Sequence, residues 1–168
     1  MSHATIRSAF PEWPIQARRL RDAVAVLTDE QLAFVPVPGG WPLWAAIGHL
    51  GCQRVFWLCD FAGEHGAEAT PYPDAAFDCP GDDDLEHVLG ATQLVKGLDA
   101  SFAIVEHCLD TWTPGSLEEV IRHPEWGDDR VHSRGFVIQR VYAHDISHIT
   151  DLNGSFTAVG LPSIDLWG

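Results

Sequence analysis

Apolar residues recur at helical spacing along most of the chain, and this pattern predicts an all-α protein with little strand. Four long helices are expected, over residues 11–27, 42–61, 85–112 and 133–153, with loops or irregular segments over residues 36–40, 62–80 and 113–132. In the first helix Leu20, Val24 and Leu27 form one apolar stripe. The segment after residue 153 ends in large apolar groups, so we expect it to fold back onto the helices.

Local signals set the expected helix ends. Pro42 suits the first helical position, where a backbone N–H has no partner. The carboxylates of residues 82–84 favour the positive end of a helix dipole, so the third helix is expected to begin after them. Asn153 and Gly154 predict the end of the fourth helix.

The third helix carries the pattern of a bundle helix. Its predicted core stripe is Leu85, Val88, Thr92, Val95, Phe102, Val105, Leu109 and Trp112. Apolar residues at seven-residue spacing are typical of the seam between packed helices. No repeat or long linker divides the chain, so residues 1–168 are expected to form a single domain, a four-helix bundle.

Composition narrows the possible functions. The 168 residues are 46% hydrophobic with seven tryptophans, enough for a sizeable core. The formal net charge is −14 with Lys96 as the single lysine, which argues against nucleic acid and anionic membranes as partners. No apolar run reaches the ~20 residues of a membrane span. The first residues lack the pattern of a signal peptide, so a cytoplasmic protein is expected.

Four cysteines, Cys52, Cys59, Cys79 and Cys108, form no C-x-x-C pair. With no export signal, they are expected to be reduced and largely buried thiols. Cys52 follows His49 by three residues and could flank a metal, but a small core residue is the favoured interpretation.

Three histidines form the candidate metal site. His144 and His148 are four apart in the fourth helix, where such residues are neighbours roughly 5–6 Å apart at Cβ. His49 lies in the apolar second helix. Two imidazoles at this spacing can reach one ion at ~2.0–2.1 Å each, and a third from a facing helix leaves coordination positions open. Each signal alone is weak, but together in a bundle they favour a metal site over separate structural histidines.

Three charged residues of the fourth helix lie near the histidines and are candidates for supporting the site. Asp145 lies within the apolar stripe and must be paired, either with a ligand histidine, most plausibly His49, or with an arginine such as Arg54. Arg140 and Asp151 lie just outside the two histidines. They are candidate substrate contacts, although a solvated arginine at the rim is the favoured interpretation of Arg140.

Other chemistries find no support in the sequence. It has no G-x-S-x-G motif, no Walker A loop and no G-x-G-x-x-G motif. The acidic runs 82–84 and 128–129 lack the spacing of an EF-hand and are expected to be solvated.

Two motifs resemble the DinB-like (YfiT-like) superfamily of small bacterial four-helix metalloproteins. The first covers residues 30–50, where Glu-Gln-Leu and a Pro/Gly loop precede Trp41 and a helix carrying Gly-His49-Leu. The second is Tyr-Ala-His144-Asp-Ile-Ser-His148. The order of elements is similar over nearly the whole chain. Two positions depart from the family pattern: Pro42 stands where Ser or Thr commonly caps the helix, and Thr150 stands where Gly is common after the second histidine. These departures weaken any inference from the family to a particular substrate.

The resemblance implies a divalent metal, usually zinc or nickel, bound by His49, His144 and His148, and frequent homodimers. Characterised relatives include thiol S-transferases that use low-molecular-weight bacterial thiols, and thiol-dependent isomerases. The resemblance therefore implies a metal-dependent enzyme that transfers a thiol to a small electrophile, and Asp145, Arg140 and Asp151 are the candidate supporting residues. The alternatives are a metal-dependent hydrolase and a non-catalytic metal-binding stress-response protein.

Overall fold

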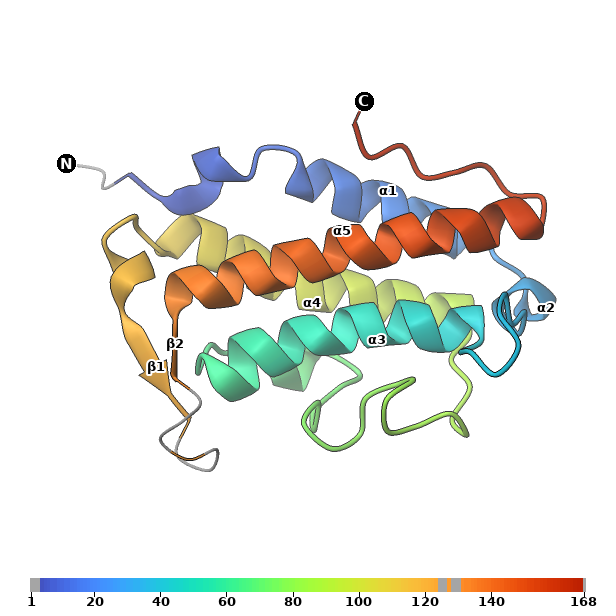
Figure 1. The fold of residues 1–168 in the computed structure, drawn as a ribbon, viewed down its shortest axis with the longest axis horizontal. Coiled ribbons are helices and arrows are strands. Elements are labelled where there is room, and N and C mark those ends of the chain that lie inside the picture. The colour runs from blue at the N-terminus through green and yellow to red at the C-terminus, as the bar shows by residue number, and fades with distance from the viewer. Residues whose placement is uncertain (1–3, 124–126, 128–130, 168) are drawn as a thin grey trace.

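Four long helices dominate the computed structural model, which describes residues 4–123, 127 and 131–167 (Figure 1). They are α1 (Trp13–Ala25), α3 (Leu43–Val55), α4 (Ala91–Thr111) and α5 (Arg134–Ala158). The four lie side by side along the long axis of the molecule; α4 contacts both α1 and α3, and α3 contacts α5. The prediction of a mainly helical chain is confirmed.

Shorter elements precede or connect the long helices. They are η1 (Ile6–Ala9), α2 (Asp29–Leu32), the π-helix η2 (Phe56–Phe61), η3 (Ala67–Ala69), η4 (Ser116–Glu118), β1 (Val120–Arg122) and β2 (Val131–Ser133). The π-helix continues α3, so the two together cover the predicted second helix. β1 and β2 form an antiparallel hairpin within the segment predicted to be irregular. Residues 124–126 and the acidic run 128–129 lie outside the described residues.

The predicted start of the third helix is wrong. α4 begins at Ala91, where the Gly90 N–H donates to Gln93 Oε1 over 3.1 Å. Residues 82–84 instead belong to turns, in which Asp83 and Asp84 donate their backbone N–H groups to the Cys79 carbonyl. Local backbone bonds compete with a helix start, and they prevail here. The actual buried face of α4 consists of Leu94, Gly97, Leu98, Ser101, Phe102, Ile104, Val105, Cys108 and Leu109, whereas Leu85, Val88 and Thr92 are exposed.

The fourth helix starts where predicted and ends later. The Ser133 hydroxyl accepts from the Phe136 N–H and caps α5. The predicted end at Asn153 and Gly154 is wrong, because α5 continues to Ala158. The Asn153 side chain instead binds the tail: its Oδ1 accepts from the Ile164 N–H over 2.7 Å.

The tail folds back over α1 and α5, as predicted (Figure 1). Ile164 and Leu166 are buried beside Leu20 and Phe156, and Gln16 Nε2 donates to the Leu166 carbonyl over 2.9 Å. Among the described residues, no helix has both the length and the apolarity needed to cross a membrane.

Candidate metal centre

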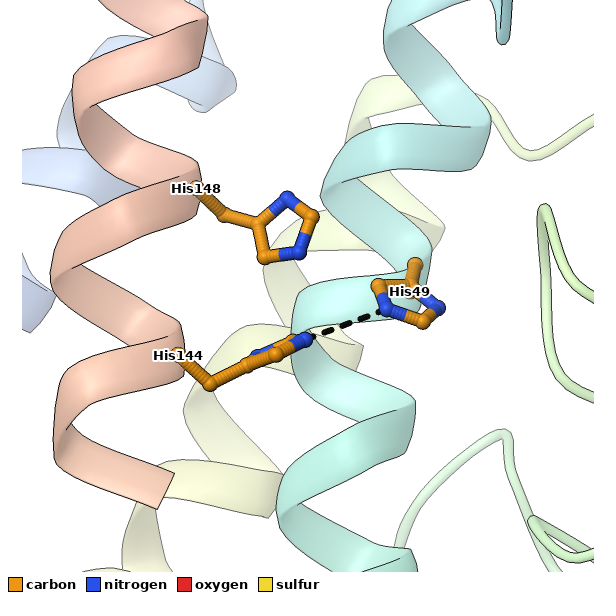
Figure 2. Close-up of side chains that lie close together, drawn as sticks. All are labelled: His49, His144 and His148. Atoms are coloured by element: carbon orange, nitrogen blue, oxygen red, sulfur yellow. Dashed lines mark hydrogen bonds between the residues drawn. The ribbon is translucent and has the colours of Figure 1, made fainter. Parts of the chain in front are cut away.

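Three imidazoles converge between α3 and α5 (Figure 2). His144 and His148 come from successive turns of α5, and His49 faces them from α3. Nε2 of His49 lies 3.1 Å from Nε2 of His144, and one nitrogen from each ring lies within 4.8 Å of the others. The ring centroid of His49 lies 5.1 Å from those of both His144 and His148. The structure thus brings together the three histidines that the sequence singles out.

The spacing fits one divalent ion. Ligand nitrogens at ~2.0–2.1 Å from a tetrahedral ion lie about 3.3–3.4 Å apart. The distance of 3.1 Å between His49 and His144 needs only a small adjustment to meet this value. The Trp41 side chain packs against the ring of His49, with 4.9 Å between the two ring centroids.

Burial favours the neutral form of these rings. It lowers the pKa of His144 to about 3, and repulsion from His148, when that ring is protonated, acts in the same direction. Burial also lowers the pKa of His49, against the opposing effect of the Asp82 carboxylate, and lowers that of His148, against Asp151. A neutral imidazole keeps a lone pair, which is the form that binds a metal.

Two cavities reach the histidines from the surface. One of about 220 Å³ is lined by Arg140, Ala143, His144, Ser147 and His148. The other, of about 210 Å³ and mainly apolar, includes Trp41, Leu43, Leu152, Asp151 and His148. An ion among the three rings would therefore be open to small molecules from the side of His148, as catalytic sites require.

Asp145 lies on the same helix as the histidines but points into the core. Its carboxylate pairs with Arg54, with 2.8 Å from Oδ2 to Nη2 and 3.0 Å to Nε. Trp13 Nε1 also donates to Oδ2 over 2.8 Å. Of the two interpretations drawn from the sequence, this geometry corresponds to the ion pair with Arg54.

Arg140 and Asp151 lie at the rim. Both are exposed, and each lines one of the two cavities beside His148. The guanidinium of Arg140 lies 5.7 Å from the centroid of the Trp57 ring. This geometry leaves both side chains within the reach of a small molecule at the histidines.

The other nitrogen of His49 faces residues that the sequence analysis did not connect with the site. Nδ1 lies 3.4 Å from Asp82 Oδ2 and 3.7 Å from Cys79 Sγ. Gly48 allows the turn after Cys79 to approach, because a Cβ there would lie 3.0 Å from Pro80. His49 and Cys79 are 30 positions apart in the sequence, so no local sequence pattern indicates this contact.

The expectation of four reduced thiols is corrected in one respect. Cys52 and Cys79 form a disulfide, with their Cα atoms 5.8 Å apart, and both are buried. Cys59 and Cys108 are free; burial raises the pKa of Cys59 to about 11 and raises that of Cys108 as well. Since the paired cysteines are 27 residues apart and no C-x-x-C motif marks them, the fold alone brings them together.

Comparisons with known proteins give one family. Among curated proteins none matches this sequence. A solved structure, a DinB-like protein from Bacillus cereus ATCC 10987, is similar with a TM-score of 0.68 at 20% identity, covering 99% of this chain and 100% of that one. This likeness shows a shared fold. The family model of the DinB superfamily matches residues 13–152, which include all three histidines. The chain therefore belongs to the DinB superfamily.

Proposed function

We propose that this protein is a metal-dependent enzyme that transfers a low-molecular-weight thiol to a small electrophile. In this proposal the chain is a four-helix bundle and a homodimer, with a zinc or nickel ion between α3 and α5. The observation that carries the proposal is the convergence of His49, His144 and His148 within 4.8 Å, beside two surface cavities. Three neutral imidazoles with an open side are typical of catalytic rather than structural metal sites.

The three histidines would hold the ion through one ring nitrogen each. A divalent ion in such a site lowers the pKa of a thiol or of water and so supplies a nucleophile at neutral pH. Because burial keeps the imidazoles neutral, they present lone pairs without first losing protons at neutral pH.

The two cavities beside His148 differ in polarity, so we assign them to different parts of the reactants. Arg140 would attract an anionic group, such as the carboxylate of a thiol co-substrate, into the cavity that it shares with His144 and Ser147. The cavity with Trp41, Leu43 and Leu152 is mainly apolar and would take the carbon skeleton of the electrophile. Asp151 would contact polar groups of the substrate at the mouth of this second cavity.

Metal content is the first test. Elemental analysis of the purified protein is expected to give one divalent ion per chain, and His144→Ala and His148→Ala are expected to lose it. His87→Ala is the matched control, because His87 is exposed and its ring pairs with Asp84 instead of the three rings. Full metal content in either ligand variant contradicts the site.

Turnover is the second test. The metal-loaded protein is assayed against a panel of bacterial thiols and small electrophiles, with Arg140→Ala expected to raise KM for anionic thiols more than it lowers kcat. Activity on ester or amide substrates without any thiol would instead favour a hydrolase. A metal-loaded protein with neither activity would favour a binding protein.

A further inference from the structure

A second group of metal-ligating atoms lies on the far side of His49. It consists of Nδ1 of His49, Sγ of Cys79 and a carboxylate oxygen of Asp82, all within 4.8 Å of one another. Figure 2 shows Nε2 of His49 directed toward His144, so the opposite ring nitrogen, Nδ1, remains for a second partner. None of the proposed chemistry at the three histidines uses Cys79 or Asp82.

The distances suit a tetrahedral ion. Zinc binds histidine nitrogen at ~2.0–2.1 Å, thiolate sulfur at about 2.3 Å and carboxylate oxygen at ~2.0–2.2 Å. Tetrahedral angles then place nitrogen and sulfur about 3.6 Å apart, and nitrogen and oxygen about 3.4 Å apart. The observed separations from His49 Nδ1 are 3.7 Å to Cys79 Sγ and 3.4 Å to Asp82 Oδ2.

Backbone interactions hold the turn that carries two of these ligands. The Cys79 N–H donates to Asp83 Oδ2 over 2.9 Å, and the Gly81 N–H donates to the Asp84 carbonyl over the same distance. Gly81 has φ +88° and packs against Trp41, so a side chain at this position would strain the turn. The ligand geometry is thus built into the fold.

The disulfide controls the access of a metal to this group. While Cys79 is bonded to Cys52, its sulfur is no thiolate and cannot act as a strong metal ligand. We propose that reduction of the Cys52–Cys79 disulfide opens a second metal site, formed by His49, Cys79 and Asp82, for a divalent ion such as zinc. His49 then bridges two ions through its two ring nitrogens.

The chemistry balances with a dithiol as reductant. The dithiol becomes a disulfide and delivers two electrons and two protons, the Sγ–Sγ bond breaks, and two thiols remain. Binding of the second ion displaces the thiol proton of Cys79 and the Nδ1 proton of His49 to solvent. Asp82 contributes a carboxylate oxygen from an exposed position. The exposed side of Asp82 gives the ion a path from solvent.

Cobalt(II) is the probe, because thiolate bound to cobalt absorbs strongly in the near ultraviolet and imidazole does not. The full chain is titrated with cobalt in the oxidised form and after reduction with dithiothreitol and anaerobic desalting. We expect one equivalent without thiolate absorption in the oxidised protein, and two equivalents with this absorption in the reduced protein.

Five variants, two of them controls, make the test specific. Cys52→Ser frees Cys79 without a reductant and is expected to bind two equivalents in air-free buffer. Cys79→Ser is expected to bind one equivalent of cobalt both before and after reduction. Cys59→Ser, its matched control, is expected to behave as the wild type. Asp82→Asn is expected to lose the second equivalent, and Asp78→Asn, at an exposed position before the turn, to keep it.

The outcomes separate this proposal from the function proposed above. One equivalent without thiolate absorption in both the reduced wild type and Cys52→Ser overturns the second site, and so does thiolate absorption that persists in Cys79→Ser. An oxidised protein that takes up no cobalt contradicts the three-histidine site instead. Adding His144→Ala and His148→Ala to Cys52→Ser is expected to leave one equivalent with its thiolate absorption.

Discussion

At the scale of single residues, the interior holds a fully buried ion pair. Arg54 and Asp145 are both inaccessible to solvent, and Trp13 gives the carboxylate a further donor. Arg54 also donates to the Leu98 carbonyl and to Ser101 Oγ over 3.3 Å each. A guanidinium stays charged at any ordinary pH, so loss of its carboxylate leaves a buried charge without its counter-ion.

Asp145→Asn is therefore expected to lower the free energy of unfolding by about 3–5 kcal/mol, the usual range when one partner of a buried pair is removed. Urea denaturation of the metal-free protein measures this change. Asp151→Asn is the control, since an exposed position should change stability by less than ~0.5 kcal/mol. Equal stability of the two variants contradicts the prediction.

The same variant also tests whether Asp145 supports the metal. If it orients a ligand histidine, metal affinity of the folded variant falls by roughly 10–100-fold. Affinity that stays unchanged in folded Asp145→Asn assigns the residue to folding through Arg54 alone. A metal titration of the wild type and of Asp145→Asn, under conditions where both are folded, distinguishes support of a ligand histidine from a role in folding alone.

At the scale of elements, long amphipathic helices could be predicted and their irregular ends could not. The spacing of His144 and His148 places both on one face wherever α5 begins, so their meeting with His49 depended little on exact boundaries. The acidic run 82–84 looked like a helix start, but its backbone groups find partners in a turn. That turn depends on packing between residues far apart in the sequence, and so does the contact of Asp82 with His49. A local sequence pattern cannot predict either of them.

Two helical glycines offer a matched pair of substitutions. Gly154 lies in α5, where an added Cβ would meet nothing within 4 Å, so Gly154→Ala should raise stability by about 0.5–1 kcal/mol through helix propensity. Gly97 lies in α4, where a Cβ would be 2.6 Å from Tyr72 Oη, and Gly97→Ala should destabilise the protein. Thermal or urea unfolding of both variants checks the opposite signs.

At the scale of the whole molecule, the charge distribution argues against nucleic acid as a partner. The chain has ten basic residues and 24 acidic ones. Several of the basic residues already form ion pairs with carboxylates. Arg7, Arg19, Arg21, Arg54 and Arg134 form such ion pairs. With so little free positive charge, we expect no binding to phosphates driven by the release of counterions.

Fluorescence anisotropy with duplex and single-stranded DNA at low salt is the direct test. We expect dissociation constants weaker than ~100 µM, at or beyond the weak end of non-specific binding. Sub-micromolar binding to either DNA would contradict the charge argument and would also argue against a small-molecule substrate. Repeating the titration with added salt shows whether any residual signal is electrostatic.

The tail has a practical consequence for anyone producing this protein. The family match ends at residue 152, which makes that position a natural-looking place to truncate. A chain cut there loses the last turns of α5 together with Ile164 and Leu166. These two side chains pack in the same buried cluster as Leu20 and Val24 of α1, here called the apolar seam. We expect such a shortened protein to aggregate during expression, whereas an affinity tag placed after the tail leaves the seam closed.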